Sequence, residues 1–302
     1  MKYLIVLIVL LLSPFIALPA AGGQKSNPED LAEPDQVVIY KKVGDTELHL
    51  HLFNPPGHKA PDKTPAIVFF FGGGWNGGTP SQFYNQAAYF ASRGMVAISA
   101  EYRTKKSSGT SPQECVKDGK SAVRWLRSHA AELGIDPNRI AAGGGSAGGH
   151  VAAATATLKG FNEDGEDTMT SCRPDALVLF NPVFDNGPEG YGYDRVKDYW
   201  KEFSPIDNID ASTPPTIVFL GTEDHLIPVD TSKRFQKLMQ KAGGRCDLHL
   251  YDSQEHGFFN KAKYAETLFE ADKFLVSLGY LKGEPKLQIP DTGEKLIPAP
   301  QK

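Results

Sequence analysis

The chain has 302 residues, of which 40% are hydrophobic, so it can bury a sizeable core as one large domain or two small ones. Its formal net charge of −4 is mild and no basic block is present, which argues against nucleic acid or an anionic membrane surface as the main partner.

The first residues have the composition of a secretory signal peptide. A positive start at Met1-Lys2 precedes an apolar run from Tyr3 to Leu12, and small residues follow near Ala20. A membrane anchor is the alternative, but the apolar run is too short to span a bilayer comfortably. We therefore predict a signal peptide over residues 1–21, a polar linker over 22–35, and a secreted or periplasmic mature protein that has no membrane anchor.

From residue 37 onward, the hydrophobic pattern predicts strands that alternate with helices. Strands are expected at 37–40 and 48–53, as a leading antiparallel pair, and then at 66–71, 95–100, 139–143, 176–180, 216–220 and 248–251. Helices are expected at about 82–92, 112–133, 149–156, 229–242 and 261–278. Strands that are apolar throughout and alternate with helices are typical of a mostly parallel sheet, here eight-stranded, with helices on both faces.

Residues 182–209 form a long excursion that does not fit this alternation. Such a connection is more often a functional lid than an idle loop, although it could instead be an insertion that covers one sheet edge. We predict a small lid segment here, with substrate contacts from Tyr191, Tyr193 and Trp200. A second polar loop spans 160–173, and the proline-rich tail, 283–302, is predicted to be loosely ordered.

The sequence Gly-Gly-Ser-Ala-Gly at 144–148 lies between a predicted strand and a predicted helix. This is the setting that the G-x-S-x-G nucleophile elbow requires, in which the serine is exposed on a sharp, strained turn. Glycine-rich chains produce the pattern by chance, so Ser146 has to be judged by its partners.

Two further polar residues follow later strands at the same predicted sheet edge. Asp224 comes after the strand at 216–220, and His256 comes after the strand at 248–251. The order serine, acid, histidine is the one expected of α/β-hydrolases. His256 would act as the base for Ser146, and Asp224 would hold the imidazole in the useful tautomer. Asp252 is a weaker candidate for the acid.

A run of glycines at 72–74 follows directly on the strand at 66–71. Glycines let the backbone approach a reacting carbonyl and direct N–H groups at it, so Gly73 and Gly74 are candidate oxyanion donors. Ala147, one residue past the serine, would supply another N–H. A phosphate cradle is disfavoured because no Gly-Lys-Ser/Thr follows. Trp75 borders the glycines and is a candidate substrate contact.

The remaining reactive side chains have structural interpretations. Cys115, Cys172 and Cys246 lack the spacing of a zinc site, so no metal is expected. One pair of them could form a disulfide in an oxidising compartment, and the spacing does not say which pair. Asp118 is predicted to be a buried structural carboxylate, and His150 to be packed rather than catalytic.

Four motifs together resemble those of the α/β-hydrolase esterases and lipases of the hormone-sensitive-lipase-like type. They are Phe-Gly-Gly-Gly-Trp at 71–75, Gly-Gly-Ser-Ala-Gly-Gly at 144–149, Gly-Thr-Glu-Asp at 221–224 and His-Gly-Phe at 256–258. Within that family, the chain is most similar to exported carboxylesterases related to acetyl xylan and feruloyl esterases. The resemblance covers about 60–280 and implies an α/β-hydrolase domain, here over 36–282. It also implies ester hydrolysis through an acyl-enzyme on Ser146, and no metal or cofactor.

The chain departs from the family pattern at two positions. Relatives usually begin the glycine loop with a histidine whose side chain braces the loop, and this chain has Phe71 there. Many relatives carry Asp or Glu where this chain has Gly145. The first departure bears on loop geometry and the second on substrate preference.

These observations predict a secreted serine carboxylesterase that hydrolyses short acyl esters, with acetyl or feruloyl groups on polysaccharides as candidate substrates. A serine peptidase of the same fold is one alternative, although the chain lacks room for a propeller or large gating domain. A non-catalytic binding protein is another, but a binding module has no need of Ser146, Asp224 and His256 together.

Overall fold

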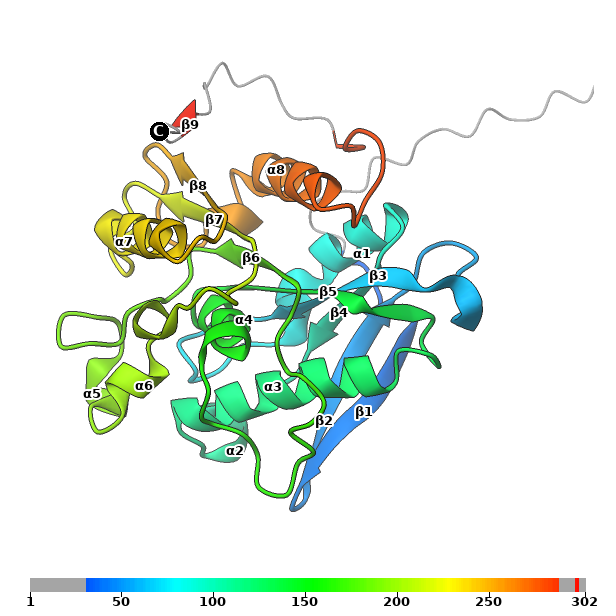
Figure 1. Cartoon of the computed structure of the whole chain (residues 1–302), viewed down its shortest axis with the longest axis horizontal. Coiled ribbons are helices and arrows are strands. Elements are labelled where there is room, and N and C mark those ends of the chain that lie inside the picture. Colours follow the sequence, from blue (N-terminus) through cyan, green and yellow to red (C-terminus); the bar gives the residue numbers. More distant parts are fainter. Residues whose placement is uncertain (1–30, 288–296, 299–302) are drawn as a thin grey trace, which may run out of the picture. The chain divides into compact units, whose positions relative to one another are not determined.

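A nine-stranded sheet runs through the part of the chain that the computed structural model describes, residues 31–287 and 297–298 (Figure 1). The sheet order is β1-β2-β4-β3-β5-β6-β7-β8-β9. Neighbours from β4 across to β8 are parallel, whereas β1, β2 and β9 pair antiparallel. The strands are β1 (Gln36–Val43), β2 (Thr46–Phe53), β3 (Thr64–Phe70), β4 (Val96–Ala100), β5 (Ile135–Gly145), β6 (Ala176–Phe180), β7 (Thr216–Gly221), β8 (Cys246–Tyr251) and β9 (Ile297–Pro298).

Helices cover both faces of the sheet (Figure 1). One face packs against α1 (Tyr84–Ser92) and α8 (Tyr264–Ser277), and the other against α3 (Pro112–Ser128), α4 (Ala147–Thr157) and α7 (Val229–Lys241). The shorter elements are α2 (Lys105–Ser108), α5 (Tyr193–Val196), α6 (Trp200–Phe203) and the 3-10 helices Ala60–Asp62, Pro80–Phe83, Pro205–Asn208 and Phe258–Asn260.

The central strand β3 shows why its sequence is apolar throughout. Val68 and Phe70 point into the core beneath α3 and α4, while Ile67 and Phe69 point into the core beneath α1 and α8. All four side chains are fully buried. Because both faces of the strand are covered, period-two alternation of polar and apolar residues is absent, as expected for a parallel sheet between helices.

The predicted mostly parallel sheet with helices on both faces is confirmed, and each of the eight predicted strands is present. The third helix ends at Ser128, five residues before the predicted end at Leu133. The ring of His129 stacks on Trp125 there, and Gly134 at φ 64° reverses the chain into β5. The short strand β9 departs from the loosely ordered tail predicted for 283–302.

Several expectations concern membranes and cysteines. No helix in the described part of the chain has the length and apolar character needed to cross a membrane. The predicted signal peptide, 1–21, and most of the predicted linker, 22–35, lie outside the described residues. Cys115, Cys172 and Cys246 are free thiols, so the structure contains no disulfide between them.

The packing of α3 on α4 generates a prediction at Gly119. A Cβ at this position would lie 2.4 Å from Cγ1 of Val151, whose β-branched side chain has little rotamer freedom. Alanine favours a helix over glycine by about 1 kcal/mol, but overpacking costs about 1–3 kcal/mol. Gly119→Ala should therefore lower the free energy of unfolding, measured in urea.

The matched control is Gly160→Ala, because nothing lies within 4 Å of a Cβ at that position. Its free energy of unfolding should stay within about 0.5 kcal/mol of the original protein. If Gly119→Ala is as stable as the original protein, α3 and α4 do not approach each other as closely at this position as the structure shows.

Candidate active site

Ser146 occupies the turn between the end of β5 at Gly145 and the start of α4 at Ala147, with φ 54° and ψ −120°. A positive φ is strained for a residue with a side chain. The turn has no room for side chains on either side of the serine. A Cβ on Gly144 would lie 2.5 Å from the Gly148 carbonyl oxygen, and a Cβ on Gly148 would lie 2.1 Å from that of Phe70.

The structure brings Ser146, His256 and Asp224 into one hydrogen-bonded chain. His256 Nε2 lies 2.9 Å from Ser146 Oγ, and its Nδ1 lies 2.7 Å from Asp224 Oδ2. The Asp224 side chain is fully buried, and its other oxygen accepts the N–H groups of Leu226 and Ile227, both at 2.9 Å. A carboxylate can only accept, so Nδ1 carries the proton and Nε2 is free to accept from the serine.

The neighbouring charged residues lie elsewhere. Glu223, His225 and Glu255 are exposed. Asp252, the weaker candidate for the acid, is exposed as well and accepts a hydrogen bond from the Thr222 hydroxyl at 3.3 Å. The acid that contacts His256 is therefore Asp224, as position after the strand predicts.

The conformation of the glycine loop limits where its backbone N–H groups point. The Gly73 carbonyl accepts hydrogen bonds from the N–H groups of Asn76 at 3.0 Å and Gly77 at 3.3 Å. A planar trans peptide directs its C=O and N–H to opposite sides, so the Gly74 N–H points away from that turn. Gly73 at φ 131° and Gly74 at φ 62° adopt conformations that favour glycine. Ala147 begins α4, where the N–H has no intrahelical partner.

An aromatic stack braces the loop where relatives use a histidine. The Phe71 ring stacks on Tyr102 with ring centroids 4.1 Å apart, and the Tyr102 hydroxyl donates to the Phe71 carbonyl at 2.5 Å. Gln82 accepts the Gly72 N–H at 2.6 Å. The loop is thus held without the histidine, through residues that the motif alone does not reveal.

A cavity of about 400 Å³ opens over Ser146 and His256, whereas Asp224 and Ala147 do not line it. It is lined by Gly72, Gly73, Gly74, Gln82, Gly145, Ser146, Asn181, Tyr191, Leu226, His256, Gly257, Phe259, Asn260 and Lys261. Tyr191 is the residue of the predicted lid segment that reaches this cavity. Its ring lies beside Arg195, which donates to the Gly74 carbonyl at 2.5 Å.

Three predicted substrate contacts do not line the cavity: Trp75, Tyr193 and Trp200. Trp75 has φ 58°, is 1% exposed, and packs against His150 and Phe203 behind the loop. Tyr193 is half-buried at the start of α5, and Trp200 is half-buried in α6, against the core. The aromatic pattern of the segment thus reflects packing more than substrate contact.

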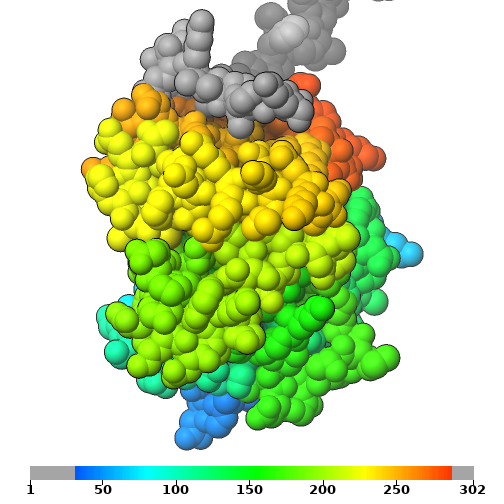
Figure 2. Space-filling model, turned by 60° about the vertical axis from the view of Figure 1, so that its left-hand side comes forward, coloured from blue at the N-terminus to red at the C-terminus, as the bar shows by residue number. Residues whose placement is uncertain are grey.

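The sequence offers two interpretations of the segment 182–209, a lid over the site and an insertion that covers part of the sheet. The structure shows features of both. Phe184 stacks on Phe235 of α7, with ring centroids 3.7 Å apart, and Asp185 forms an ion pair with Arg234. Figure 2 shows the segment in yellow-green on the surface beside the yellow region that contains α7. It therefore packs along the α7 side of the sheet, while Tyr191 and Arg195 extend to the glycine loop.

Sequence reasoning missed two residues that shape the site. Asn181 has φ 35°, accepts the Gly257 N–H at 3.0 Å, and places its amide nitrogen 3.5 Å from His256 Nε2. It directly follows β6, so the rule that ligands gather at strand ends could have found it. Phe259 lies against Gly145: a Cβ there would be 2.6 Å from its ring. No sequence signal marks this contact.

Comparisons with known proteins identify the family of this fold. The BD-FAE family model matches residues 50–185, and the dienelactone hydrolase family model matches 190–275. Thermogutta terrifontis esterase 2 is similar in structure, with 44% sequence identity and a TM-score of 0.80. The match covers 85% of this chain and 99% of that one. The chain belongs to the α/β-hydrolase esterases. Its reaction class is carboxylic-ester hydrolysis.

More distant relatives have the same class of activity. A carboxylesterase of Mycobacterium tuberculosis is 27% identical over 82% of each chain. A probable isoprenylcysteine alpha-carbonyl methylesterase of Arabidopsis thaliana is 28% identical over 68% of this chain, which spans only 48% of the plant protein. An acetylxylan esterase of Xylanibacter ruminicola is 26% identical over 64% of this chain and 41% of its own length.

His150, which packs behind the site, generates a prediction about pH. It is fully buried in α4, its Nε2 donates to the Phe203 carbonyl at 3.0 Å, and burial lowers its pKa to about 3. The folded state keeps His150 neutral, whereas the unfolded chain binds a proton below pH ~6.5. Stability is therefore lost as the pH falls from ~6.5 towards 3, by up to about 1.4 kcal/mol per pH unit.

Urea unfolding between pH 7 and pH 5 measures this dependence. His150→Gln, which keeps an N–H donor, should remove that part of the slope, whereas His225→Gln, at an exposed position, should leave it unchanged. An unchanged slope in His150→Gln would show that His150 is not the titrating group.

Proposed function

We propose that the protein is a secreted serine carboxylesterase that hydrolyses short acyl esters through an acyl-enzyme on Ser146. The observation that carries the proposal is the hydrogen-bonded chain from Ser146 through His256 to Asp224, at a strained turn that opens on a cavity. Such a chain couples a nucleophile to a base, and the base to the group that orients it.

Acylation follows from this geometry. Ser146 Oγ attacks the ester carbonyl carbon while its proton moves to His256 Nε2, and the carbonyl electron pair moves onto oxygen. The N–H groups of Gly73, Gly74 and Ala147 stabilise that oxyanion. The bond to the alcohol oxygen then breaks as His256 delivers the proton to it, which leaves the acyl group on Ser146.

Deacylation repeats these steps with water as the nucleophile. His256 takes a proton from water as the water oxygen attacks the acyl carbon. It then returns this proton to Ser146 Oγ as the carboxylic acid leaves. Asp224 stabilises the imidazolium in both halves of the reaction. The Leu226 and Ile227 N–H groups donate to the other Asp224 oxygen and keep the carboxylate oriented throughout the reaction.

The cavity wall supports a preference for short acyl groups. The Phe259 ring lines the cavity beside Gly145, and the ring of Phe83 stacks against it, so this wall consists of bulky, buried side chains. Structures of Thermogutta terrifontis esterase 2 hold propionate and butyrate. By analogy, acyl groups of this size fit here, and so does the smaller acetyl group.

A polysaccharide ester is the proposed natural substrate, with an acetyl group as the acyl part; a feruloyl group, which is much larger than the acyl groups argued above, is the alternative. The signal-peptide-like composition of residues 1–21 and the similarity to an acetylxylan esterase support it. Release of acetate and of ferulate from a panel of esterified polysaccharides distinguishes the two acyl groups. Secretion is tested by expressing the full chain and locating the mature N-terminus by mass spectrometry.

The catalytic roles are tested with p-nitrophenyl acetate. Ser146→Ala should abolish turnover, because no other group can form the acyl-enzyme. Asp224→Asn should lower kcat about 10⁴-fold, since the imidazole loses the partner that fixes its tautomer. Glu223→Gln is the matched control beside it, and its kcat should change less than about twofold. Full activity in Ser146→Ala would refute the proposed mechanism.

The acyl preference is tested at two adjacent phenylalanines that are equally buried. Phe259→Ala removes the cavity wall and should raise the ratio of kcat/KM for octanoate over acetate esters by about tenfold or more. Phe258→Ala is the control, because Phe258 packs on Tyr251 and does not line the cavity. Equal ratios in the two variants would mean that Phe259 does not limit the acyl group.

A further inference from the structure

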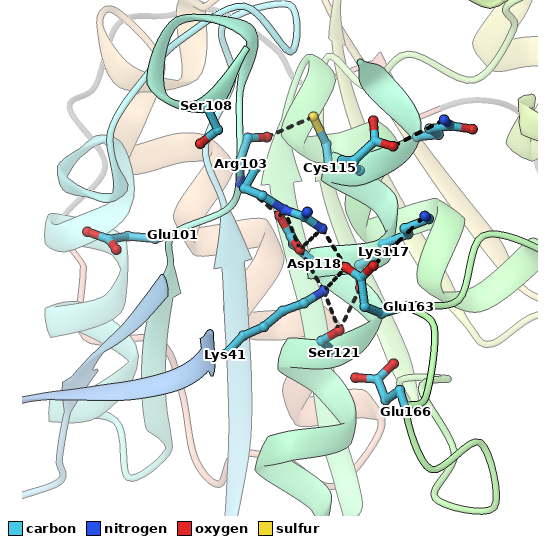
Figure 3. Close-up of polar contacts among 12 residues, drawn as sticks. Lys41, Glu101, Arg103, Ser108, Cys115, Lys117, Asp118, Ser121, Glu163 and Glu166 are labelled. Atoms are coloured by element: carbon cyan, nitrogen blue, oxygen red, sulfur yellow. Dashed lines mark hydrogen bonds and ion pairs between the residues drawn. The ribbon is translucent and has the colours of Figure 1, made fainter. Parts of the chain in front are cut away.

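A cluster of charged side chains gathers at α3 (Figure 3). It consists of Lys41 from β1, Arg103 from the segment after β4, Asp118 from α3 and Glu163 from the loop 160–173. Asp118 lies 2.7 Å from the Lys41 ammonium and 2.7 Å from the Arg103 guanidinium. Glu163 contacts the same two cations, at 2.7 Å from Lys41 and 2.5 Å from Arg103. Lys117 of α3 also lies 3.9 Å from Glu163, so three cations face two carboxylates in the cluster.

Both carboxylates accept hydrogen bonds from the cations around them. Asp118 is fully buried and is surrounded by donors. Burial raises the pKa of Glu163, but the hydrogen bonds and charges of Lys41 and Arg103 outweigh it and lower that pKa overall. Removal of one charge from such a cluster leaves an uncompensated buried ion, so its geometry is strongly constrained.

Asp118 fixes the backbone of Arg103 as well as its side chain. It accepts the Arg103 backbone N–H at 2.9 Å, Nε at 2.8 Å and Nη2 at 2.7 Å. On the other side, the Cys115 thiol donates to the Arg103 carbonyl at 3.1 Å. Helix α3 thus determines where the irregular chain after β4 runs.

The same stretch of chain, residues 102–106, holds both ends of the glycine loop. The Tyr102 hydroxyl donates to the Phe71 carbonyl at the start of the loop. The backbone N–H groups of Lys105 and Lys106 donate to the carbonyls of Trp75 at 3.1 Å and Asn76 at 2.8 Å, at its end. Gly73 and Gly74, the proposed oxyanion donors, lie between these anchors.

We propose that Asp118 and Arg103 are positioning residues for the oxyanion hole. The pair fixes residues 102–106 on α3, and these residues fix the glycine loop so that the Gly73 and Gly74 N–H groups meet the developing oxyanion. The inference rests on the proposed serine-esterase function. It assigns the cluster a role in transition-state stabilisation in addition to its role in folding stability. A small displacement of the oxyanion-hole N–H groups lowers the reaction rate strongly.

A second buried ion pair on the same helix provides a matched control. Arg124 pairs with Glu166 and also donates to Asn162 and to the Thr170 carbonyl. It fastens the loop 160–173 to α3 and has no hydrogen bond to residues 102–106 among those described. Arg124→Lys therefore disturbs a buried pair on α3 that reaches Arg103 only indirectly, through Glu163 of the same loop.

The experiment compares Arg103→Lys and Asp118→Asn with Arg124→Lys in the full chain. Circular dichroism and thermal unfolding first show that each variant is folded at the assay temperature. We expect kcat for p-nitrophenyl acetate to fall about 10- to 100-fold in the first two variants, with KM changed less than about threefold. Affinity for a trifluoromethyl ketone, whose adduct with Ser146 carries an oxyanion, should fall by a similar factor.

Two results would overturn the inference. One is a kcat within twofold of the original protein in folded Arg103→Lys and Asp118→Asn. The other is an equal fall in kcat and ketone affinity in Arg124→Lys, which would indicate a general loss of packing. An end-point titration with paraoxon counts the reactive serines, so a reduced fraction of active protein is not mistaken for a slower reaction.

Tyr102→Phe keeps the inference testable if the charge variants do not fold. It removes only the hydroxyl that bonds the Phe71 carbonyl and keeps the ring stack. We expect kcat and ketone affinity to fall severalfold together, and unchanged values would count against the inference. If the original protein does not hydrolyse p-nitrophenyl acetate, both the proposed function and the inference are wrong. If the original protein hydrolyses it but the variants behave like the original protein, only the inference is wrong.

Discussion

The absence of space at the turn between β5 and α4 is the constraint on which the rest of the site depends. Because a Cβ on Gly144 or Gly148 would collide with carbonyl oxygens, the chain can reverse there only with glycine on both sides of Ser146. The serine is forced to a positive φ, and its hydroxyl meets His256 Nε2 at the edge of the sheet. The buried apolar strands around β3 keep that turn from relaxing.

The glycine loop is held from two directions. On one side, Tyr102 and the backbone of residues 105–106 bind its carbonyls, and on the other, Arg195 of the excursion 182–209 binds the Gly74 carbonyl. The Gly73 carbonyl is bound inside the loop by the Asn76 and Gly77 N–H groups, so the opposed Gly74 N–H of the same planar peptide is directed away from that turn. This arrangement explains how a chain with Phe71 in place of histidine can retain an oxyanion hole.

The sequence predicts the parts of the protein that depend on local pattern. Apolar runs placed every one of the eight main strands, and strand-end positions brought Ser146, Asp224 and His256 to one edge. It does not predict contacts that depend on side-chain packing between distant segments. Trp75 follows the glycines and still points behind the loop, and Phe259 reaches Gly145 from more than a hundred residues away.

The helix boundaries show the same limit. The apolar pattern of the third helix continues to Leu133, but the chain leaves the helix after Ser128 because Gly134 and the pairing of β5 require a reversal. Likewise, the sequence marks 160–173 only as a polar loop, whereas the structure pairs Glu163 with Arg103 and Glu166 with Arg124. Such pairings come from tertiary structure alone.

Peptide mass spectrometry after reaction with paraoxon tests the central claim most directly. Thermogutta terrifontis esterase 2 is phosphorylated by this compound. The account predicts one diethylphosphoryl group per chain, located on Ser146, with loss of esterase activity in proportion to labelling. Labelling of another residue, or complete inactivation with Ser146 unmodified, would contradict the assignment of Ser146 as the nucleophile.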